Sequence, residues 1–277
     1  IEHRADATAL PLPALFGEHT WPDLVERMIG PSFLARANQL GVRTGELHLA
    51  LASESSDPEF VPEPFTAADQ QELASSLETS ISGVMELCRS QRDTLGEVAE
   101  APVDRLLRAS EGLQKHVSAF AAAPPSGGAK TRTHGDYHLG QVLETGSDFV
   151  IIDFEGEPSR SLAERRQKRS PLRDVAGMLR SFHYAAHSAL GDFADQQAVL
   201  APWAEVWAIA AMRAFLDGWT RTTAGAAFLP QDPARVAGLL DAFLLEKALY
   251  EVGYELNNRP TWVGIPARGV LRLVGAE

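Results

Sequence analysis

Apolar residues recur every three to four positions along most of this chain, which is the spacing of one face of an α-helix. Thr66 is expected to cap one helix, and Ser170-Pro171 to begin another. Residues 1–31 show no sustained period apart from a short helix from about Trp21, and are expected to be a linker or lead-in. The pattern predicts helices at about 32–53, 66–90, 102–123, 170–190, 193–221 and 232–258, with a short terminal segment after Pro260.

One stretch departs from the helical pattern. The segments QVLE and FVIID flank a turn at residues 145–148, which is typical of a β-hairpin. Val150, Ile151 and Ile152 are expected to form a buried strand that delivers Asp153 at its carboxyl end. The expected fold class is therefore mainly α with one small β-hairpin.

The composition and charge of the chain limit the classes of protein to which it can belong. The chain has 277 residues, of which 45% are hydrophobic and 22% charged, as in an ordinary globular protein. Its net charge of −12 and scattered basic residues argue against nucleic-acid binding; residues 160–169 form the one basic cluster. The lone Cys88 cannot form an internal disulfide, no run approaches eighteen apolar residues, and no leader opens the chain. A cytoplasmic location without membrane partners is expected.

The candidate catalytic and metal-binding residues lie in and next to the predicted hairpin. A tight turn at His134-Gly135-Asp136 precedes the first strand, Gln141 opens that strand, and Asp153 ends the second. A hairpin brings these segments together, so that two carboxylates and an amide oxygen can converge. Such hard oxygen ligands suit Mg²⁺ and phosphate chemistry, and a nearby carboxylate can accept a proton from an attacking hydroxyl. Single acids at strand ends are common without any such role, but the combination is far more specific.

The motif also resembles a known family. THGDYHLGQVL, IIDFEGEP and RSPLRDVAGMLRSFHYA resemble the catalytic and metal loops of aminoglycoside-phosphotransferase-like kinases, and within them the maltokinase branch, which is often fused to trehalose synthase. The resemblance implies a protein-kinase-like, C-terminal lobe over residues 32–277. Its catalytic hairpin would be residues 131–156 and its acceptor-side helices residues 170–277.

The resemblance implies a role for each matching residue. Asp136 would be the catalytic base and His134 would brace its loop. Gln141 and Asp153 would bind Mg²⁺ that also holds the ATP phosphates. Asp174 would steady the catalytic loop; alternatively, its carboxylate is simply favoured by the helix N-terminus.

The nucleotide-binding motifs of a kinase are not found in this sequence. There is no glycine-rich loop between strands, and SGGAK at 126–130 lacks the spacing of a P-loop. The four lysines fall in segments predicted to be helix or loop. The N-terminal nucleotide lobe is therefore expected to be absent, which makes the chain either a fragment that is inactive alone or a degenerate homologue with a binding role.

A sugar site combines aromatic faces with polar groups. The stretch ALYEVGYELNNRPTW offers both, with a polar helical face followed by a tryptophan, although such faces are often merely solvated. The candidate acceptor residues are Glu155, Glu251, Tyr254, Glu255, Asn258 and Trp262.

The activity implied is ATP-dependent phosphorylation of maltose on its anomeric hydroxyl, for α-glucan synthesis, with Mg²⁺ and ATP and with trehalose synthase as a fused or associated partner. One alternative is a kinase for another small hydroxylated acceptor, such as an aminoglycoside, choline-like alcohol or homoserine. The other is a non-catalytic module that binds sugar or docks trehalose synthase.

Overall fold

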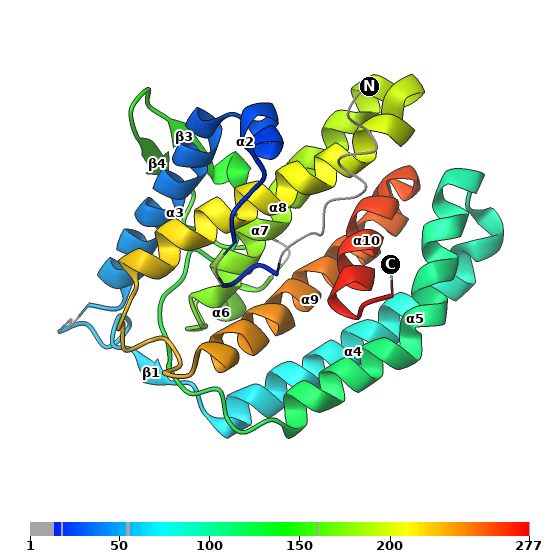
Figure 1. Ribbon diagram of the computed structural model, residues 1–277. Helices are drawn as coiled ribbons and strands as arrows, with labels where there is room; N and C mark the ends of the chain where they lie inside the picture. Colours follow the sequence, from blue (N-terminus) through cyan, green and yellow to red (C-terminus); the bar gives the residue numbers. More distant parts are fainter. Residues whose placement is uncertain (1–13, 18, 54–55, 159, 277) are drawn as a thin grey trace. The chain divides into compact units, whose positions relative to one another are not determined.

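The computed structural model describes residues 14–17, 19–53, 56–158 and 160–276 (Figure 1). These residues are mostly helical, and their contacts cluster into two compact units. The first unit draws on Ile1–Pro62, Thr131–Lys168 and Ser181–Ala226, and the second on Glu63–Lys130, Arg169–Arg180 and Ala227–Glu277. Each unit is therefore assembled from segments that lie far apart in the sequence.

The first unit holds the predicted hairpin and a pair of long helices. Helix α7 (Leu172–Ser188) begins in the second unit and ends in the first. The other elements of the first unit are α2 (Asp23–Ile29), α3 (Pro31–Leu51), η2 (Leu139–Gln141), β3 (Val142–Glu144), β4 (Phe149–Ile151), α6 (Leu162–Arg165), η3 (Ala189–Gln196) and α8 (Gln197–Thr222).

Helices α3 and α8 form the core of the first unit and lie against each other (Figure 1). Glycines let their backbones approach closely. A Cβ atom added at Gly41 would lie 2.0 Å from the carbonyl oxygen of Phe215, and one added at Gly218 would lie 2.1 Å from that of Asn38. The fully buried Trp219 donates its Nε1 proton to Nδ1 of His48 at 3.0 Å. This tryptophan is a core residue.

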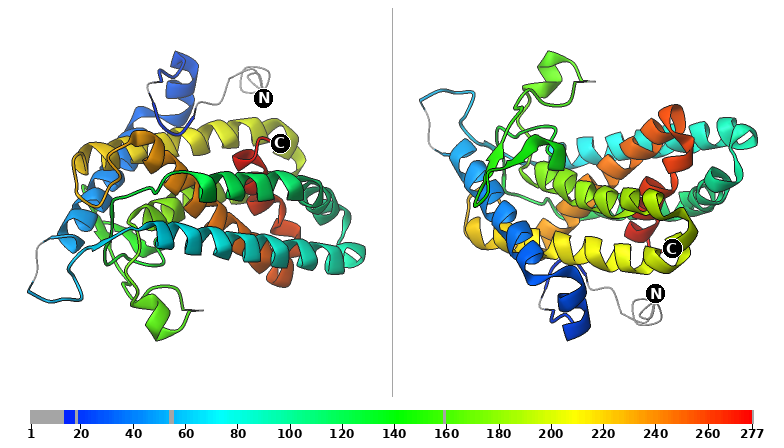
Figure 2. Two further views of the ribbon diagram at one scale, coloured as in Figure 1. Left: turned by 90° about the horizontal axis from the view of Figure 1, so that it is seen from below. Right: turned by 90° about the horizontal axis from the view of Figure 1, so that it is seen from above.

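The second unit is built on four helices and a two-stranded sheet. Helices α4 and α5 run side by side, as Figure 1 and the left view of Figure 2 show. They pack with α9 and α10 around one apolar cluster, which contains the buried Cys88. The elements are β1 (Glu63–Pro64), α4 (Ala67–Gln91), η1 (Arg92–Thr94), α5 (Glu97–Ala122), β2 (Ala129–Lys130), α9 (Pro233–Asn258), η4 (Pro260–Trp262) and α10 (Gly264–Leu273).

The N-terminus of α4 shows why the chain begins a helix there. Thr66 accepts a hydrogen bond from the backbone of Asp69, and the Asp69 carboxylate accepts one from the backbone of Thr66 at 2.7 Å. This reciprocal capping box satisfies two amides at the helix start. Lys130 of β2 also pairs with Asp69 at 2.7 Å, which ties the sheet to the helix.

Several expectations about the elements need correction. The described residues hold two small sheets instead of one hairpin, because β1 and β2 also pair in antiparallel fashion. Their two-residue strands are too short to leave an alternating pattern. Lys130, expected in a loop, lies in β2. Helix α5 begins at Glu97, five residues before the predicted start, with Pro102 inside it.

The second strand of the predicted hairpin also differs from expectation. The hairpin itself is present, with Val142 opposite Ile151 and Leu143 opposite Val150. However, Leu143 is 51% exposed and Val150 is 48% exposed, and Ile151 and Ile152 are only half-buried. The strand is therefore not a core strand, and an apolar run of this length does not by itself establish burial.

Helix α8 is long and apolar enough to cross a membrane by length and composition alone. Its apolar window is 56% buried, and core helices of soluble proteins pass the same test. The packing of α8 against α3 accounts for its apolar composition.

Candidate functional site

The turn before the hairpin is built around His134, which is 1% exposed. Its Nε2 lies 2.8 Å from the carbonyl oxygen of Ile152, beyond the end of β4. Because a carbonyl only accepts, Nε2 carries the proton, and Nδ1 accepts the backbone N–H of Asp136 at 3.4 Å. This single imidazole therefore joins the Asp136 turn to the strand that leads to Asp153.

Aromatic contacts hold His134 in this orientation. Its ring lies 5.2 Å from Tyr137 and 4.9 Å from Phe154, centroid to centroid. The Tyr137 hydroxyl lies 2.8 Å from Oγ1 of Thr44. Since Thr44 already donates its proton to the carbonyl oxygen of Leu40, the tyrosine is the donor. The turn is thus anchored to helix α3.

The turn presents Asp136 as a partly exposed carboxylate. Gly135 has a positive φ of 88°, and a Cβ there would lie 3.2 Å from Cα of Gly156, so a side chain would be both strained and crowded. His138 accepts the backbone N–H of Gly140 through Nδ1, which leaves the proton on Nε2, 3.9 Å from Oδ2 of Asp136. Sequence reasoning did not identify His138 as a neighbour of Asp136.

Gln141 and Asp153 are brought together at the open end of the hairpin. The Gln141 side-chain nitrogen donates to Oδ2 of Asp153 at 3.0 Å, and the Gln141 carbonyl accepts from the backbone of Ile152. Asp153 has a φ of 64°, the only positive value among the described residues other than glycine. A non-glycine residue in this region costs conformational energy, and such residues concentrate at functional sites.

Three polar residues of α3 fix the far end of the hairpin. Arg36 pairs with Glu144 at 2.7 Å, and its guanidinium lies 4.1 Å from the centre of the Phe149 ring. Gln39 donates to the carbonyl oxygen of Ser147 at 2.8 Å. Sequence reasoning missed this support, although the spacing of the polar residues along one face of α3 was a visible signal.

The third of these residues, Arg43, binds Asp148 through two hydrogen bonds of 2.7 and 2.9 Å. These bonds hold the pKa of the Asp148 carboxyl below its usual value, with help from the backbone N–H of Phe149. The pair is therefore ionised across the neutral range, and the hairpin turn is held to α3 by charge.

The expected acceptor residues of α9 are engaged in contacts within the second unit. Glu251 pairs with Arg180 at 2.7 Å, and the buried Glu255 pairs with Arg259 at 2.7 Å. Asn258 donates its side-chain amide to the backbone of Tyr254. The expected polar face is therefore divided into two ion pairs and an exposed tyrosine.

The remaining expected site residues are placed as follows. The ring of Trp262 lies 4.6 Å from the guanidinium of Arg259, and Tyr254 is 47% exposed. Asp174 is 2% exposed in the first turn of α7, and its role in steadying a loop stays a prediction. Glu155 is exposed, and its carbonyl accepts a hydrogen bond from Arg165.

No family model matches the sequence. Two glucosamine kinases are similar to it. The one from Mycolicibacterium smegmatis is 31% identical over 87% of this chain and 54% of its own length. The one from Streptacidiphilus jiangxiensis is 27% identical over 84% of this chain and 48% of its own length. The chain thus spans about half the length of these relatives.

Solved glucosamine kinases share the fold. A crystal structure of one has a TM-score of 0.69, is 23% identical and covers 91% of this chain and 54% of its own. A structure in complex with glucosamine, ADP and inorganic phosphate has a TM-score of 0.68 at 23% identity, covering 91% of this chain and 60% of its own.

These comparisons correct the resemblance drawn from the motifs. The similar proteins are glucosamine kinases, so the assignment to maltokinases is wrong, and so is the assignment to the protein-kinase-like fold class. Nothing in the comparisons supports a link to trehalose synthase or α-glucan synthesis. The motifs misled because they are short, whereas the comparisons extend over most of the chain.

Proposed function

We propose that this chain is part of an ATP-dependent sugar kinase that phosphorylates a hydroxyl group of glucosamine. The observation that carries the proposal is the His134 bridge, which links the Asp136 turn to the strand bearing Asp153 and so fixes two carboxylates at one end of the hairpin. The similar glucosamine kinases, one of which is described in complex with glucosamine and ADP, support the choice of acceptor and co-substrate.

The residues fit a magnesium ion. Asp153 is exposed, and its Oδ2 lies 3.0 Å from the side chain of Gln141, so a carboxylate and an amide adjoin. Rotation of that amide presents its oxygen in place of its nitrogen, and hard oxygen ligands are what Mg²⁺ prefers. Asp153 and Gln141 would hold the ion, which when bound neutralises charge on the phosphate oxygens.

We infer that Asp136 acts as the base. In the proposed reaction its carboxylate accepts the proton of the sugar hydroxyl, whose oxygen forms a bond to the γ-phosphorus of ATP. The bond between that phosphorus and the oxygen bridging to the β-phosphate breaks, which releases ADP and the sugar phosphate. The backbone bond to His134 and the proximity of His138 orient Asp136.

The acceptor contacts follow from the charge of the substrate. Glucosamine carries an ammonium group, which calls for a carboxylate or other acceptors. Because Glu251 and Glu255 are bound to arginines, the exposed Glu155 is the better candidate among the expected residues. The role of Tyr254 in sugar binding stays a prediction from the sequence.

The first test is phosphate transfer from ATP to glucosamine by the gene product that contains these 277 residues. Asp136→Asn is expected to lower kcat by about a thousandfold, since general-base catalysis supplies factors of this size, while glucosamine binding measured by calorimetry stays within about threefold. The matched control is Asp232→Asn, because asparagine caps α9 as well as aspartate does.

Turnover by Asp136→Asn within tenfold of the wild type would show that Asp136 is not the base. No heat with glucosamine, alongside clear heat with maltose or N-acetylglucosamine, would show that the acceptor is a different sugar. Binding of glucosamine without any transfer would favour a sugar-binding module over a kinase.

A further inference from the structure

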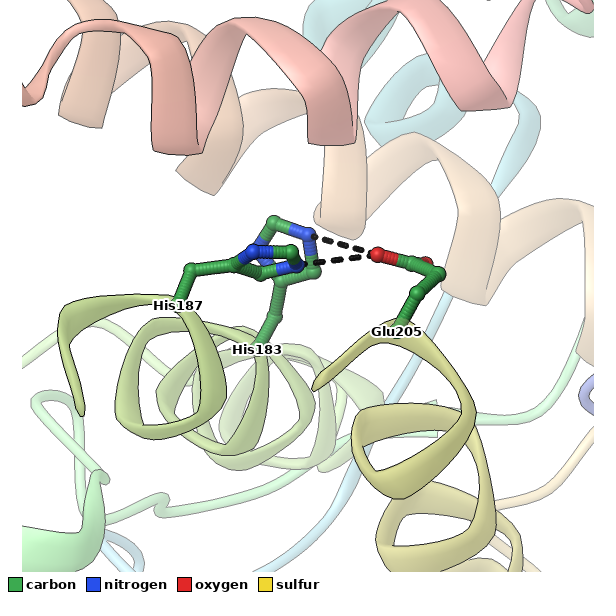
Figure 3. Close-up of side chains that lie close together, drawn as sticks. All are labelled: His183, His187 and Glu205. Atoms are coloured by element: carbon green, nitrogen blue, oxygen red, sulfur yellow. Dashed lines mark hydrogen bonds and ion pairs between the residues drawn. The ribbon is translucent and has the colours of Figure 1, made fainter. Parts of the chain in front are cut away.

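A second cluster of side chains, which could bind a metal ion, lies outside the hairpin. His183 and His187 stand one turn apart on α7, and Glu205 faces them from α8 (Figure 3). All three belong to the first unit. In Figure 3 both imidazoles point toward one oxygen of the Glu205 carboxylate.

The three ligand atoms are close enough to share one ion. Nε2 of His187 lies 2.9 Å from Oε2 of Glu205, and Nε2 of His183 lies 3.8 Å from it. All three ligand atoms lie within 4.8 Å of one another. Tetrahedral Zn²⁺ with bonds of about 2.0–2.1 Å places its ligand atoms about 3.3 Å apart. The two measured separations bracket that value, so small side-chain movements complete the geometry.

The donor set and its burial favour a transition metal. Two imidazole nitrogens and one carboxylate oxygen are ligands typical of Zn²⁺, and histidines four residues apart on a helix commonly bind one ion. His183 is 2% exposed, His187 6% and Glu205 8%. A buried carboxylate is costly unless it is paired, and a divalent cation pairs it while both imidazoles stay neutral.

The competing explanation for the cluster is an ion pair without metal. In that arrangement one imidazole is protonated and donates to Glu205, which accounts for the 2.9 Å contact with His187. It accounts for only that one contact: the second ring lies 4.5 Å from the first, and its Nε2 is 3.8 Å from the same oxygen, beyond hydrogen-bond distance. A shared ion accounts for all three orientations.

We propose that His183, His187 and Glu205 form a binding site for a divalent transition-metal ion of the Zn²⁺ class, with a fourth position for water. The ion joins the last turns of α7 to the first turns of α8, across the 3₁₀ segment Ala189–Gln196. It fixes the angle between these helices and stabilises the first unit. This site is independent of the proposed phosphoryl transfer.

The test begins with protein freed of metal by chelation and dialysis. Titration with Zn²⁺ against a competing chelating dye is expected to show one tight equivalent per chain. Co²⁺ in its place is expected to give the visible absorption bands of a four-coordinate site with nitrogen ligands. At a Zn²⁺ concentration of about a hundred times Kd, Tm is expected to rise by about 5–10 °C.

Variants assign the binding to this cluster. His187→Gln and Glu205→Gln are each expected to weaken binding by about a hundredfold or more and to abolish the cobalt bands. His116→Gln on α5 is the matched control and is expected to bind like the wild type. Glu205→Asp retains the charge on a shorter arm, so it is expected to fold, which circular dichroism checks, and to bind more weakly.

Two results would overturn the proposal. One is the absence of a stoichiometric equivalent in the wild type, which would leave the ion pair as the explanation of the cluster. The other is equal affinity in wild type, His187→Gln and Glu205→Asp, which would place the bound ion elsewhere.

Discussion

At the scale of single residues, the half-buried Asp69 is held by more than one partner. Its carboxylate accepts bonds from the backbone and hydroxyl of Thr66 and pairs with Lys130. Burial of the carboxyl works to raise its pKa, but the bonds to Lys130 and Thr66 together outweigh burial and lower the pKa below its usual value. The ionised form is therefore favoured in the folded state.

Asp69→Ala removes both the reciprocal cap and the ion pair. It is expected to lower the free energy of unfolding by about 1–2 kcal/mol at pH 7. Because the folded pKa is lowered, this stabilisation is complete above the unfolded value and is lost as the pH falls through the folded one. Urea unfolding at pH 7 and in steps below pH 4 measures it. The control is Glu72→Ala, at an exposed position. If the difference in free energy of unfolding between the wild type and Asp69→Ala stays constant down to pH 2, the explanation is contradicted.

At the scale of elements, the first unit depends on backbone contact between two long helices. Gly41 and Gly218 stand where α3 and α8 approach most closely, and each faces a backbone carbonyl of the other helix. Glycine weakens an isolated helix relative to alanine, so its presence in the interior of both helices is explained by packing. The same helix α3 carries the side chains that hold the hairpin.

Gly41→Ala is expected to destabilise the protein by about 3 kcal/mol, since the added methyl group would meet the backbone of Phe215 and the helices would have to separate. Gly83→Ala in α4 has no atom within 4 Å of the new Cβ and is expected to be neutral or to stabilise by up to ~1 kcal/mol. Urea denaturation midpoints of the two variants measure the difference. Equal midpoints would show that α3 and α8 pack less closely than described.

At the scale of the whole molecule, the net charge of the chain affects how readily the proposed substrate approaches it. The net charge of −12 favours the approach of a cation and opposes that of an anion. Glucosamine is cationic near neutral pH, whereas maltose is neutral. This balance favours a cationic acceptor such as the proposed one over a neutral sugar.

Raising the salt concentration from about 0.05 to 0.5 M is expected to weaken glucosamine binding several-fold, because screening shortens the reach of the protein's charge. Binding of a neutral sugar analogue is expected to change by less than about twofold. Calorimetric titrations at the two salt concentrations compare the ligands. Glucosamine binding that is insensitive to salt would mean that long-range charge plays no part in recognition.

The sequence by itself determined the long helices, apart from the start of α5, and the hairpin, because apolar spacing and capping residues act locally. Thr66 caps α4 and Asp232 caps α9 as the rules for helix ends require. It also identified the residues of the Asp136 turn, because their order is a motif within one short stretch. Their roles in catalysis stay predictions. The predicted acceptor and fold class were wrong, since a short motif does not describe the whole chain.

Only the tertiary structure decided which distant side chains meet. Arg43 and Asp148 are more than one hundred residues apart, and no local pattern pairs them. The pairing of Glu251 with Arg180, 71 residues away in the sequence, depends on tertiary packing, although periodicity alone predicts an open polar face. The meeting of two histidines on α7 with a glutamate on α8 likewise needs both helices in place. The spacing of apolar residues determines whether a segment is a helix or a strand, whereas tertiary packing determines which distant residues its side chains contact.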